Sequence, residues 1–353
     1  MTTLRFFAGS YTSPLPHAPK AEGKGIYSLN LDLDRGLLTA PHLAAEVAQP
    51  SFLASHPHLP VLYAISELDE GQVSAYGIEP DGSLQLLNQQ STQGASPAHV
   101  SVDAAGRYVL CTNYVSGLSV LAFPVSGDGS LEPCAASDTH HGHGPNAQRQ
   151  EGPHPHSVTP SPDGRHAYVA DLGTDEVVGY DLDPDRLLKR IGRANLPPGS
   201  GPRHTAFDPA GLFAFVTLEL LPGVAILRRE PESGELALMD ICLVQLPDFS
   251  GTNAPAEVMA SPDGHFVYVS NRGHDSVAVF RFDPASVRLT LLQYAPTLGH
   301  TPRGCVLTPD GSLLLAGNQD SSSITVFRRQ HDSGLLQVMG TFDCPTPTSF
   351  CFG

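Results

Sequence analysis

One pattern recurs six times along the 353-residue chain and limits the folds open to it. Each copy passes from a proline through a short apolar strand, a turn near "SPDG", a second strand, a polar turn and a third strand. The copies begin at Pro50, Pro97, Pro155, Pro202, Pro255 and Pro302. A period near 45 residues, with four strands in each unit, is typical of a β-propeller blade.

A seventh copy is divided between the two ends of the chain. "PTSFCFG" from Pro347 supplies its first strand, and the segments "LRFFAGSYTS" and "GKGIYSLNLDLDRGLLT" supply the others. Strands rich in Val, Tyr and Phe, joined by Asp-Gly and Asn-containing turns, are hairpin signals. We therefore predict an all-β, seven-bladed propeller over residues 1–353, as one domain. Pairing of the N- and C-terminal strands within one blade would close the ring and leave no free edge there.

The repeat also predicts which residues share a face. If the first strand of a blade descends beside the central channel and the second returns, residues just after each proline meet those 16 and 17 positions later. The first ring holds Ser51 and Phe52, Ala98 and His99, His156 and Ser157, Arg203 and His204, Ala256 and Glu257, and Arg303 and Gly304. The second ring holds Ser66 and Glu67, Asn113 and Tyr114, Asp171 and Leu172, Leu218 and Glu219, Asn271 and Arg272, and Asn318 and Gln319.

Charged residues gather on these rings, whereas the "SPDG" end carries ordinary turn formers. The catalytic candidates are His156, Arg203, Glu219 and Arg272, because forked guanidinium groups suit a carboxylate, a phosphate or a developing oxyanion. A salt-bridge network that braces neighbouring blades is the structural alternative, worth about 1 kcal/mol or less per exposed pair. The candidate substrate-binding residues on or beside the rings are His99, Asn113, His154, His204, Glu257 and Arg303.

A histidine-rich stretch, "HHGHGPNAQRQEGPHPHS", occupies the long interval before the third copy of the repeat. It holds His140, His141, His143, His154 and His156. A metal site would need three or four ligands in fixed geometry, and this Gly-rich segment lacks HxxxH or HExxH spacing. A solvated surface loop is a second interpretation. We favour a third, in which the loop forms the lip of an active site and His156 enters the channel, with no bound metal.

Composition restricts the partners. The net charge of −16, with three lysines in the chain, argues against nucleic acid or an anionic membrane surface. An anionic substrate would require a local positive pocket. Six scattered cysteines without a CxxC pair predict buried free thiols. With no apolar signal region after the N-terminus and no membrane-length apolar run, the expected location is the cytoplasm.

Several catalytic motifs are missing from the sequence. It contains no GxSxG nucleophile elbow, no P-loop, and no GxGxxG that opens a helix. We therefore expect neither a covalent serine mechanism nor a nucleotide cofactor. What remains is acid–base chemistry on a small anionic molecule by His, Glu and Arg.

The same residues resemble the seven-bladed propeller lactonase family, which includes bacterial 6-phosphogluconolactonase and fungal 3-carboxy-cis,cis-muconate cyclase. The resemblance covers the whole chain. Its motifs are "GSYT" from Gly9, "NYVSG" from Asn113, the histidine-rich stretch from His140, "GPRH" from Gly201, "LE" at Glu219, "SNRG" from Ser270 and "TPRG" from Thr301. In the cyclase branch a His, two Arg and a Glu are the proposed catalytic set, which corresponds here to His156, Arg203, Glu219 and Arg272. His154 competes with His156 for the histidine role.

This resemblance implies a small anionic lactone as substrate, most simply 6-phospho-D-glucono-1,5-lactone of the pentose phosphate route. Glu219 or His156 would act as general base on water, and one arginine would stabilise the oxyanion. The other arginine, with His99 or Arg303, would hold the phosphate. A muconate-type cycloisomerase and a non-catalytic binding propeller are the alternatives, and the sequence leaves the oligomeric state open.

Overall fold

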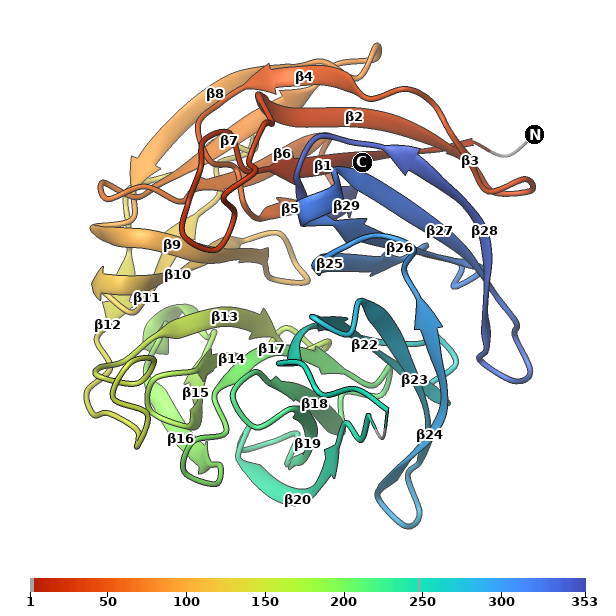
Figure 1. The fold of residues 1–353 in the computed structure, drawn as a ribbon. Coiled ribbons are helices and arrows are strands. Elements are labelled where there is room, and N and C mark those ends of the chain that lie inside the picture. Colours follow the sequence, from red (N-terminus) through yellow and green to blue (C-terminus); the bar gives the residue numbers. More distant parts are fainter. Residues whose placement is uncertain (1–2, 247) are drawn as a thin grey trace.

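The computed structural model describes residues 3–246 and 248–353. The described residues form seven antiparallel sheets that stand around a central axis like the blades of a propeller (Figure 1). The predicted seven-bladed, all-β fold is confirmed.

The first blade contains both ends of the chain. It consists of β29 (Pro347–Phe352), β1 (Thr3–Ser10), β2 (Gly25–Asp32), β3 (Leu37–Leu38) and β4 (His42–Glu46). β29 pairs antiparallel with β1 in a register that places Phe6 opposite Phe352 and Ala8 opposite Phe350. The rings of Phe6 and Phe350 pack edge to face, with centroids 5.9 Å apart. The predicted closure of the ring by the terminal strands is therefore correct, and Figure 1 shows the two strands side by side.

Each of the other six blades has four strands in chain order. The first three are β5 (Leu53–Ser55), β6 (Val61–Ser66), β7 (Gln72–Ile78) and β8 (Leu84–Ser91); β9 (Gly94–Val102), β10 (Tyr108–Gly117), β11 (Val120–Pro124) and β12 (Ala136–Asp138); and β13 (Pro155–Pro160), β14 (His166–Asp171), β15 (Glu176–Asp181) and β16 (Arg190–Asn195). A short 3-10 helix, η1 (Pro184–Arg186), precedes β16.

The remaining three blades complete the ring. They are β17 (Pro202–Phe207), β18 (Phe213–Leu218), β19 (Gly223–Arg229) and β20 (Leu236–Leu243); β21 (Ala254–Ala260), β22 (Phe266–Arg272), β23 (Ser276–Asp283) and β24 (Arg288–Pro296); and β25 (Pro302–Leu307), β26 (Leu313–Asn318), β27 (Ser323–Arg329) and β28 (Leu336–Asp343). A 3-10 turn, η2 (Gln319–Ser321), follows β26.

The hydrophobic core lies between neighbouring blades. All six residues of β6, β14, β18 and β26 are buried, whereas the outer strand β8 has no fully buried residue. These second strands are rich in Val, Leu, Ala and Phe and are packed on both faces, so they lack the alternation of a half-exposed strand. Phe215 of one blade and Phe280 of the next belong to one such interblade cluster.

Ion pairs and hydrogen bonds join neighbouring blades at the end of the ring where the "SPDG" turns lie. Arg229 donates from Nε to the Tyr168 hydroxyl at 2.9 Å and from Nη2 to Asp163 at 2.7 Å. The same arrangement recurs 100 residues later in Arg329, Tyr268 and Asp263. Because these charges contact one another and the arrangement occurs twice, they serve the fold, and the chemistry must be sought at the opposite end.

The six cysteines are unpaired in the described part of the chain, as the sequence predicts. The predicted burial holds for Cys111, Cys305 and Cys344, whereas Cys134, Cys242 and Cys351 are half-buried. Across residues 3–246 and 248–353, no helix has the length and apolar character that a bilayer crossing requires.

Candidate active site

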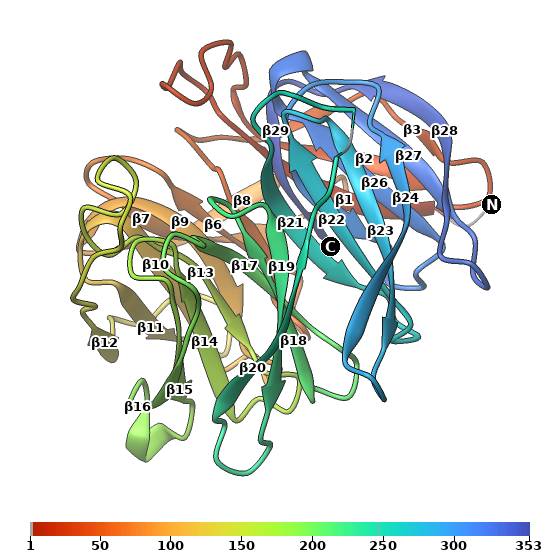
Figure 2. The ribbon, with the colours of Figure 1, turned by 60° about the horizontal axis from the view of Figure 1, so that its bottom comes forward.

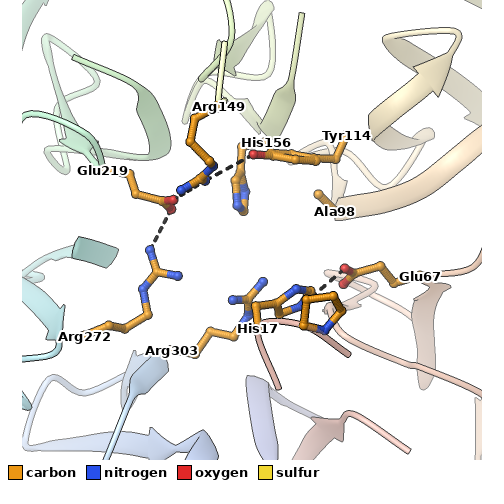
Figure 3. A pocket seen from close by; sticks show the side chains of 10 residues that line it. His17, Glu67, Ala98, Tyr114, Arg149, His156, Glu219, Arg272 and Arg303 are labelled. Atoms are coloured by element: carbon orange, nitrogen blue, oxygen red, sulfur yellow. Dashed lines mark hydrogen bonds and ion pairs between the residues drawn. The ribbon is translucent and has the colours of Figure 1, made fainter. Parts of the chain in front are cut away.

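A pocket of about 390 Å³ opens at the end of the ring opposite the "SPDG" turns. Its walls are formed by residues of the seven blades or of the loops beside them: Pro16, His17, Glu67, Ala98, Tyr114, Arg149, His156, Glu219, Arg272 and Arg303. Glu67, Tyr114, Glu219 and Arg272 all stand 17 residues after the proline of their repeat, in the last part of a second strand or just beyond it. The fold therefore brings together residues spread over nearly 300 positions (Figure 3).

Glu219 is the charged centre of one wall. Its Oε2 accepts a hydrogen bond from Nη2 of Arg272 at 2.6 Å, and its Oε1 accepts one from Nη2 of Arg149 at 2.5 Å. Nε of Arg203 lies 3.1 Å from Oε2, within ion-pair distance, although the angle is too poor for a hydrogen bond. One carboxylate thus holds three guanidinium groups, two from neighbouring blades and one from the histidine-rich loop.

These contacts set the ionisation of the cluster. Burial would raise the pKa of Glu219, but Arg272, Arg203 and Arg149 outweigh burial and hold that pKa well below its usual range. Burial, together with Arg272 and Arg303, lowers the pKa of Arg203 to about 9. Glu219 is therefore a firmly ionised counter-ion and a weak proton acceptor near neutral pH.

Arg303 differs from the other arginines of the pocket. Within the described residues its guanidinium forms no ion pair with a carboxylate, whereas Arg149 and Arg272 both contact Glu219. It lies over the Tyr11 ring, 5.3 Å from the centroid. A cation that is positioned by an aromatic face and otherwise uncommitted is suited to bind a substrate anion.

The wall facing Glu219 is built by the loop between β1 and β2. The Tyr11 hydroxyl donates to Oε2 of Glu67 at 2.9 Å, and Nε2 of His17 lies 3.0 Å from the same hydroxyl. Burial and the charges of Arg303 and Arg272 lower the pKa of His17 to about 4. Figure 2 shows this loop, in red, projecting beyond the strands.

His156 lies deep in the pocket. Its ring lines the pocket, and its Nδ1 is buried without a hydrogen-bond partner among the described residues. Burial and the charge of Arg203 hold the pKa of His156 well below its usual range, so the ring is neutral at pH 7. His154 turns elsewhere: its Nδ1 lies 2.8 Å from the Tyr114 carbonyl, and its ring stacks on the Tyr114 ring. Of the two histidines in "PHPH", His156 is the one that faces the cavity.

A much smaller space, the inner chamber, continues below the pocket. Its volume is about 10 Å³, and it is lined by Ser51, Phe52, Glu67, Ala98, His156, Arg203, His204, Arg303 and Thr348. Nδ1 of His204 lies 2.8 Å from Oε1 of Glu257, and the rings of His156 and His204 are 5.1 Å apart. Burial raises the pKa of Glu257 to about 7 despite the opposing charge of Arg203.

The sequence-predicted residues fall into three groups. His156, Glu219, Arg272 and Arg303 line the pocket, while Arg203 and His204 line the inner chamber. Glu257 contacts His204, and the ring of His99 packs against that of Phe52 at a tilt, with centroids 4.1 Å apart. Asn113 and His154 do not line either cavity. The Asn113 amide donates to the carbonyl oxygens of Thr92 and Leu118, both at 2.7 Å, and so fixes the backbone.

The histidine-rich loop forms part of the lip, through an arginine that we did not predict. Arg149 reaches from this loop to Glu219 and to the Tyr114 hydroxyl. His140 is buried between Asp171 and Tyr180, at 2.6 and 2.7 Å, whereas His141 and His143 are exposed. Among the described residues, no group of three or more His, Cys, Asp or Glu side chains is arranged to hold a metal ion.

Sequence reasoning also missed His17, and it named Glu67 and Tyr114 on the ring without assigning them to the site. The ring position was a usable signal for Glu67 and Tyr114. His17 and Arg149 gave no such signal, because their loops do not belong to the repeat.

The fold is a seven-bladed propeller, and one of its faces carries a cationic pocket of a size that suits a small molecule. These two features together place the chain in the class of enzyme-like propellers. The chain matches the family described as "Lactonase, 7-bladed beta-propeller" over residues 5–352. It belongs to that family.

Similar proteins agree with this assignment. A protein of Bacillus subtilis named 6-phosphogluconolactonase is 36% identical over 355 residues, covering 100% of this chain and 99% of the relative. A 6-phosphogluconolactonase of Formosa agariphila is 30% identical and covers 94% of each chain. The structure of a periplasmic gluconolactonase of Pseudomonas aeruginosa has a TM-score of 0.90 and 30% identity, covering 99% of each chain.

Proposed function

We propose that the protein hydrolyses 6-phospho-D-glucono-1,5-lactone to 6-phosphogluconate. The observation that carries the proposal is Arg303, an uncommitted cation in a pocket where Glu219 already neutralises other arginines. In a chain of net charge −16, this local positive surface indicates an anionic ligand. A volume of about 390 Å³ suits a molecule of the size of a phosphosugar lactone. The two 6-phosphogluconolactonases among the relatives support this substrate.

Lactone hydrolysis needs stabilisation of the oxyanion that forms when water attacks C1. Arg303 is the residue we assign to this task, since its guanidinium has no competing carboxylate partner within the described chain. Donors aimed at a developing oxyanion contribute about 3 kcal/mol in other enzymes. Arg149 and Arg272, at the mouth of the pocket, would bind the phosphate.

Proton transfer falls to an imidazole in this scheme. Glu219 is a weak base because three arginines stabilise its ionised form, so its role is to position those arginines. His156 is neutral and lines the pocket, and it would donate its Nε2 proton to the ring oxygen as the C1–O bond breaks while its Nδ1 takes up the proton released by the attacking water, so that no imidazolate forms. His99, whose ring centroid lies 5.4 Å from that of His204, would hold the His204 ring in place.

A direct assay tests the function. Freshly generated 6-phosphogluconolactone would be followed with and without enzyme, so that spontaneous hydrolysis is subtracted, and in the presence and absence of chelator. We expect acceleration that survives chelation. Glucono-1,5-lactone and 3-carboxy-cis,cis-muconate would be assayed in parallel. Turnover of the diacid alone, by lactone formation, would favour the cycloisomerase reaction instead.

The proposed substrate is a phosphorylated intermediate of the pentose phosphate route. Since phosphate esters are retained inside cells, we propose that the protein acts in the cytoplasm as a single propeller domain. The periplasmic relative shows that the fold also operates elsewhere.

A further inference from the structure

Several residues that line the inner chamber carry buried polar atoms without hydrogen-bond partners. Among the described residues, no hydrogen-bond partner exists for the following atoms of its lining: Ser51 Oγ, His156 Nδ1, Arg203 Nη1, His204 Nε2 and Thr348 Oγ1. Burying a polar group without a hydrogen bond costs about 1–3 kcal/mol, so five such groups around one space indicate a polar occupant. About 10 Å³ is close to the smallest space that accepts one water molecule.

The protonation of His204 shows which occupant fits. Oε1 of Glu257 accepts from the Val258 backbone N–H at 3.2 Å and lies 2.8 Å from His204 Nδ1. An oxygen that already accepts from a backbone amide also accepts from Nδ1–H, which leaves a lone pair on Nε2 of the neutral ring. The chamber therefore offers an acceptor at His204 and a donor at Arg203. A halide ion could satisfy only the donor, whereas water satisfies both.

We infer that the inner chamber binds the water molecule that attacks the lactone, and that His204, oriented by Glu257, is the base that takes its proton. This inference rests on the lactonase function proposed above. A carboxylate behind a histidine that faces the nucleophile is the arrangement by which enzymes orient a base and stabilise the imidazolium. His204 depends on this stabilisation, because burial and the charge of Arg203 hold its pKa well below the usual range. His204 contacts the reacting water and is catalytic, whereas Glu257 is a positioning residue.

The proton and electron balance can be followed atom by atom. The water oxygen forms a bond to C1 while its proton passes to Nε2 of His204, and the carbonyl electrons move to the oxygen held by Arg303. When the tetrahedral intermediate collapses, the C1–ring oxygen bond breaks and its electrons go to the ring oxygen. His156 gives that oxygen its Nε2 proton and receives the His204 proton at Nδ1. Exchange with water then removes the Nδ1 proton of His156 and returns one to Nε2, which restores both imidazoles for the next turnover. The carboxylic acid product then loses its own proton to solvent.

Glu257→Gln is the decisive variant. Glutamine keeps an oxygen that accepts from His204 Nδ1–H but cannot stabilise the imidazolium, so we expect kcat to fall about 100-fold while KM changes less than about threefold. Thermal unfolding would show that the variant is folded. Glu232→Gln, an exposed carboxylate paired with Arg165 near the "SPDG" turns, is the matched control and should retain activity.

The pH dependence of kcat distinguishes a role of Glu257 in catalysis from a purely structural role. Wild-type kcat should fall as pH drops through about 7, because protonated Glu257 can no longer receive charge from His204. The charged and titratable groups that face Glu257 are Arg203 and His204 of β17, His99 of β9 and Cys305 of β25. In Glu257→Gln this acid limb should vanish. An unchanged limb, or unchanged kcat, would overturn the inference while leaving the lactonase function intact.

A crystallographic measurement tests the chamber without substrate. We expect one water within hydrogen-bond distance of Nε2 of His204 and Nη1 of Arg203, both in plain crystals and after a bromide soak. An anomalous bromide peak there would identify an anion site and reject the proposed nucleophile. If wild-type enzyme fails to accelerate lactone hydrolysis at all, the proposed function fails and this inference fails with it.

Discussion

Arg272 donates a 2.6 Å hydrogen bond to Glu219, although the two residues belong to neighbouring blades. The same carboxylate contacts Arg149 and Arg203, so it fixes three cations at the positions where the pocket needs them. Such a cluster resembles a structural ion-pair network, and it does join blades. Its place on the wall of the cavity gives it a second role, because every movement of Glu219 would shift the guanidinium groups.

Glu219→Gln should therefore impair catalysis more than binding. Glutamine leaves the arginines without their counter-ion, and they lose their common orientation. We expect kcat for the phospholactone to fall about 100-fold, whereas KM stays the same or decreases because the pocket becomes more positive. Steady-state kinetics of the folded variant would measure both. A large rise in KM at constant kcat would instead assign Glu219 to ground-state binding.

Arg303 should be the most sensitive arginine for turnover. Arg303→Gln removes the cation assigned to the oxyanion without leaving a carboxylate unpaired, so kcat should fall about 100- to 1,000-fold with little loss of stability. Arg303→Lys should recover part of the activity, since it restores the charge without the forked geometry. Equal kcat in all three proteins would remove Arg303 from the reacting centre.

Much of this site could be predicted because the repeat converts sequence spacing into position. The residues 17 positions after each proline reach the cavity in four of the blades. One position earlier, the repeat places Asn113, Asp171, Asn271 and Asn318, all buried in structural contacts. Asn113 and Asn318 donate to equivalent backbone carbonyl groups, of Thr92 and Thr297. Polar residues that recur at one repeat position in several blades therefore mark the fold, and those unique to one blade mark the site.

The repeat could not predict which loop residues reach the pocket. Arg149 and His17 lie in long segments without a repeat partner, and only tertiary contacts bring them to the pocket. For His17 these include a hydrogen bond from Nε2 of Gln319 to its backbone carbonyl, which spans 302 residues of sequence. The partnership of Glu257 with His204 was equally hidden, because adjacent ring positions do not reveal which side chains meet.

Arg149 should determine preference for the phosphorylated substrate. It is the pocket arginine that comes from a loop, its side chain is 44% exposed, and it stands at the mouth. Arg149→Ala should raise KM for 6-phosphogluconolactone about tenfold, yet leave KM for glucono-1,5-lactone nearly unchanged. Kinetics on both lactones, corrected for spontaneous hydrolysis, would reveal the difference. An equal effect on both would mean that Arg149 supports the cavity and does not recognise the phosphate.

Acid should destabilise the fold through the buried histidines. Burial holds the pKa of His99, His156 and His204 well below the ordinary value of 6.5. The unfolded chain therefore binds more protons as pH falls, and stability that is present above about 6.5 is lost below it. Glu257 has the opposite effect on stability between about pH 4.5 and pH 7, because its pKa is raised. The effect of the three histidines should outweigh that of this single carboxyl group.

Calorimetry between pH 5 and pH 8 would measure this effect. The midpoint temperature should decrease on acidification below pH 6.5. Replacing His99, which does not line either cavity, by Phe should reduce the slope. A midpoint that rises toward pH 5 would contradict the assignment of neutral, buried imidazoles.

Ring closure predicts a marked effect at Phe350, far from the pocket mouth. Its side chain is 9% exposed and packs against Phe6 across the pairing of β29 with β1. Phe350→Ala should lower the free energy of unfolding by about 3–5 kcal/mol, because it opens a cavity at the contact that joins the chain ends. Leu298→Ala is the matched control, since Leu298 is 62% exposed and should cost less than about 0.5 kcal/mol. Urea unfolding in one cooperative transition would support a single domain over residues 1–353, whereas early loss of the first blade alone would show that the ring tolerates opening.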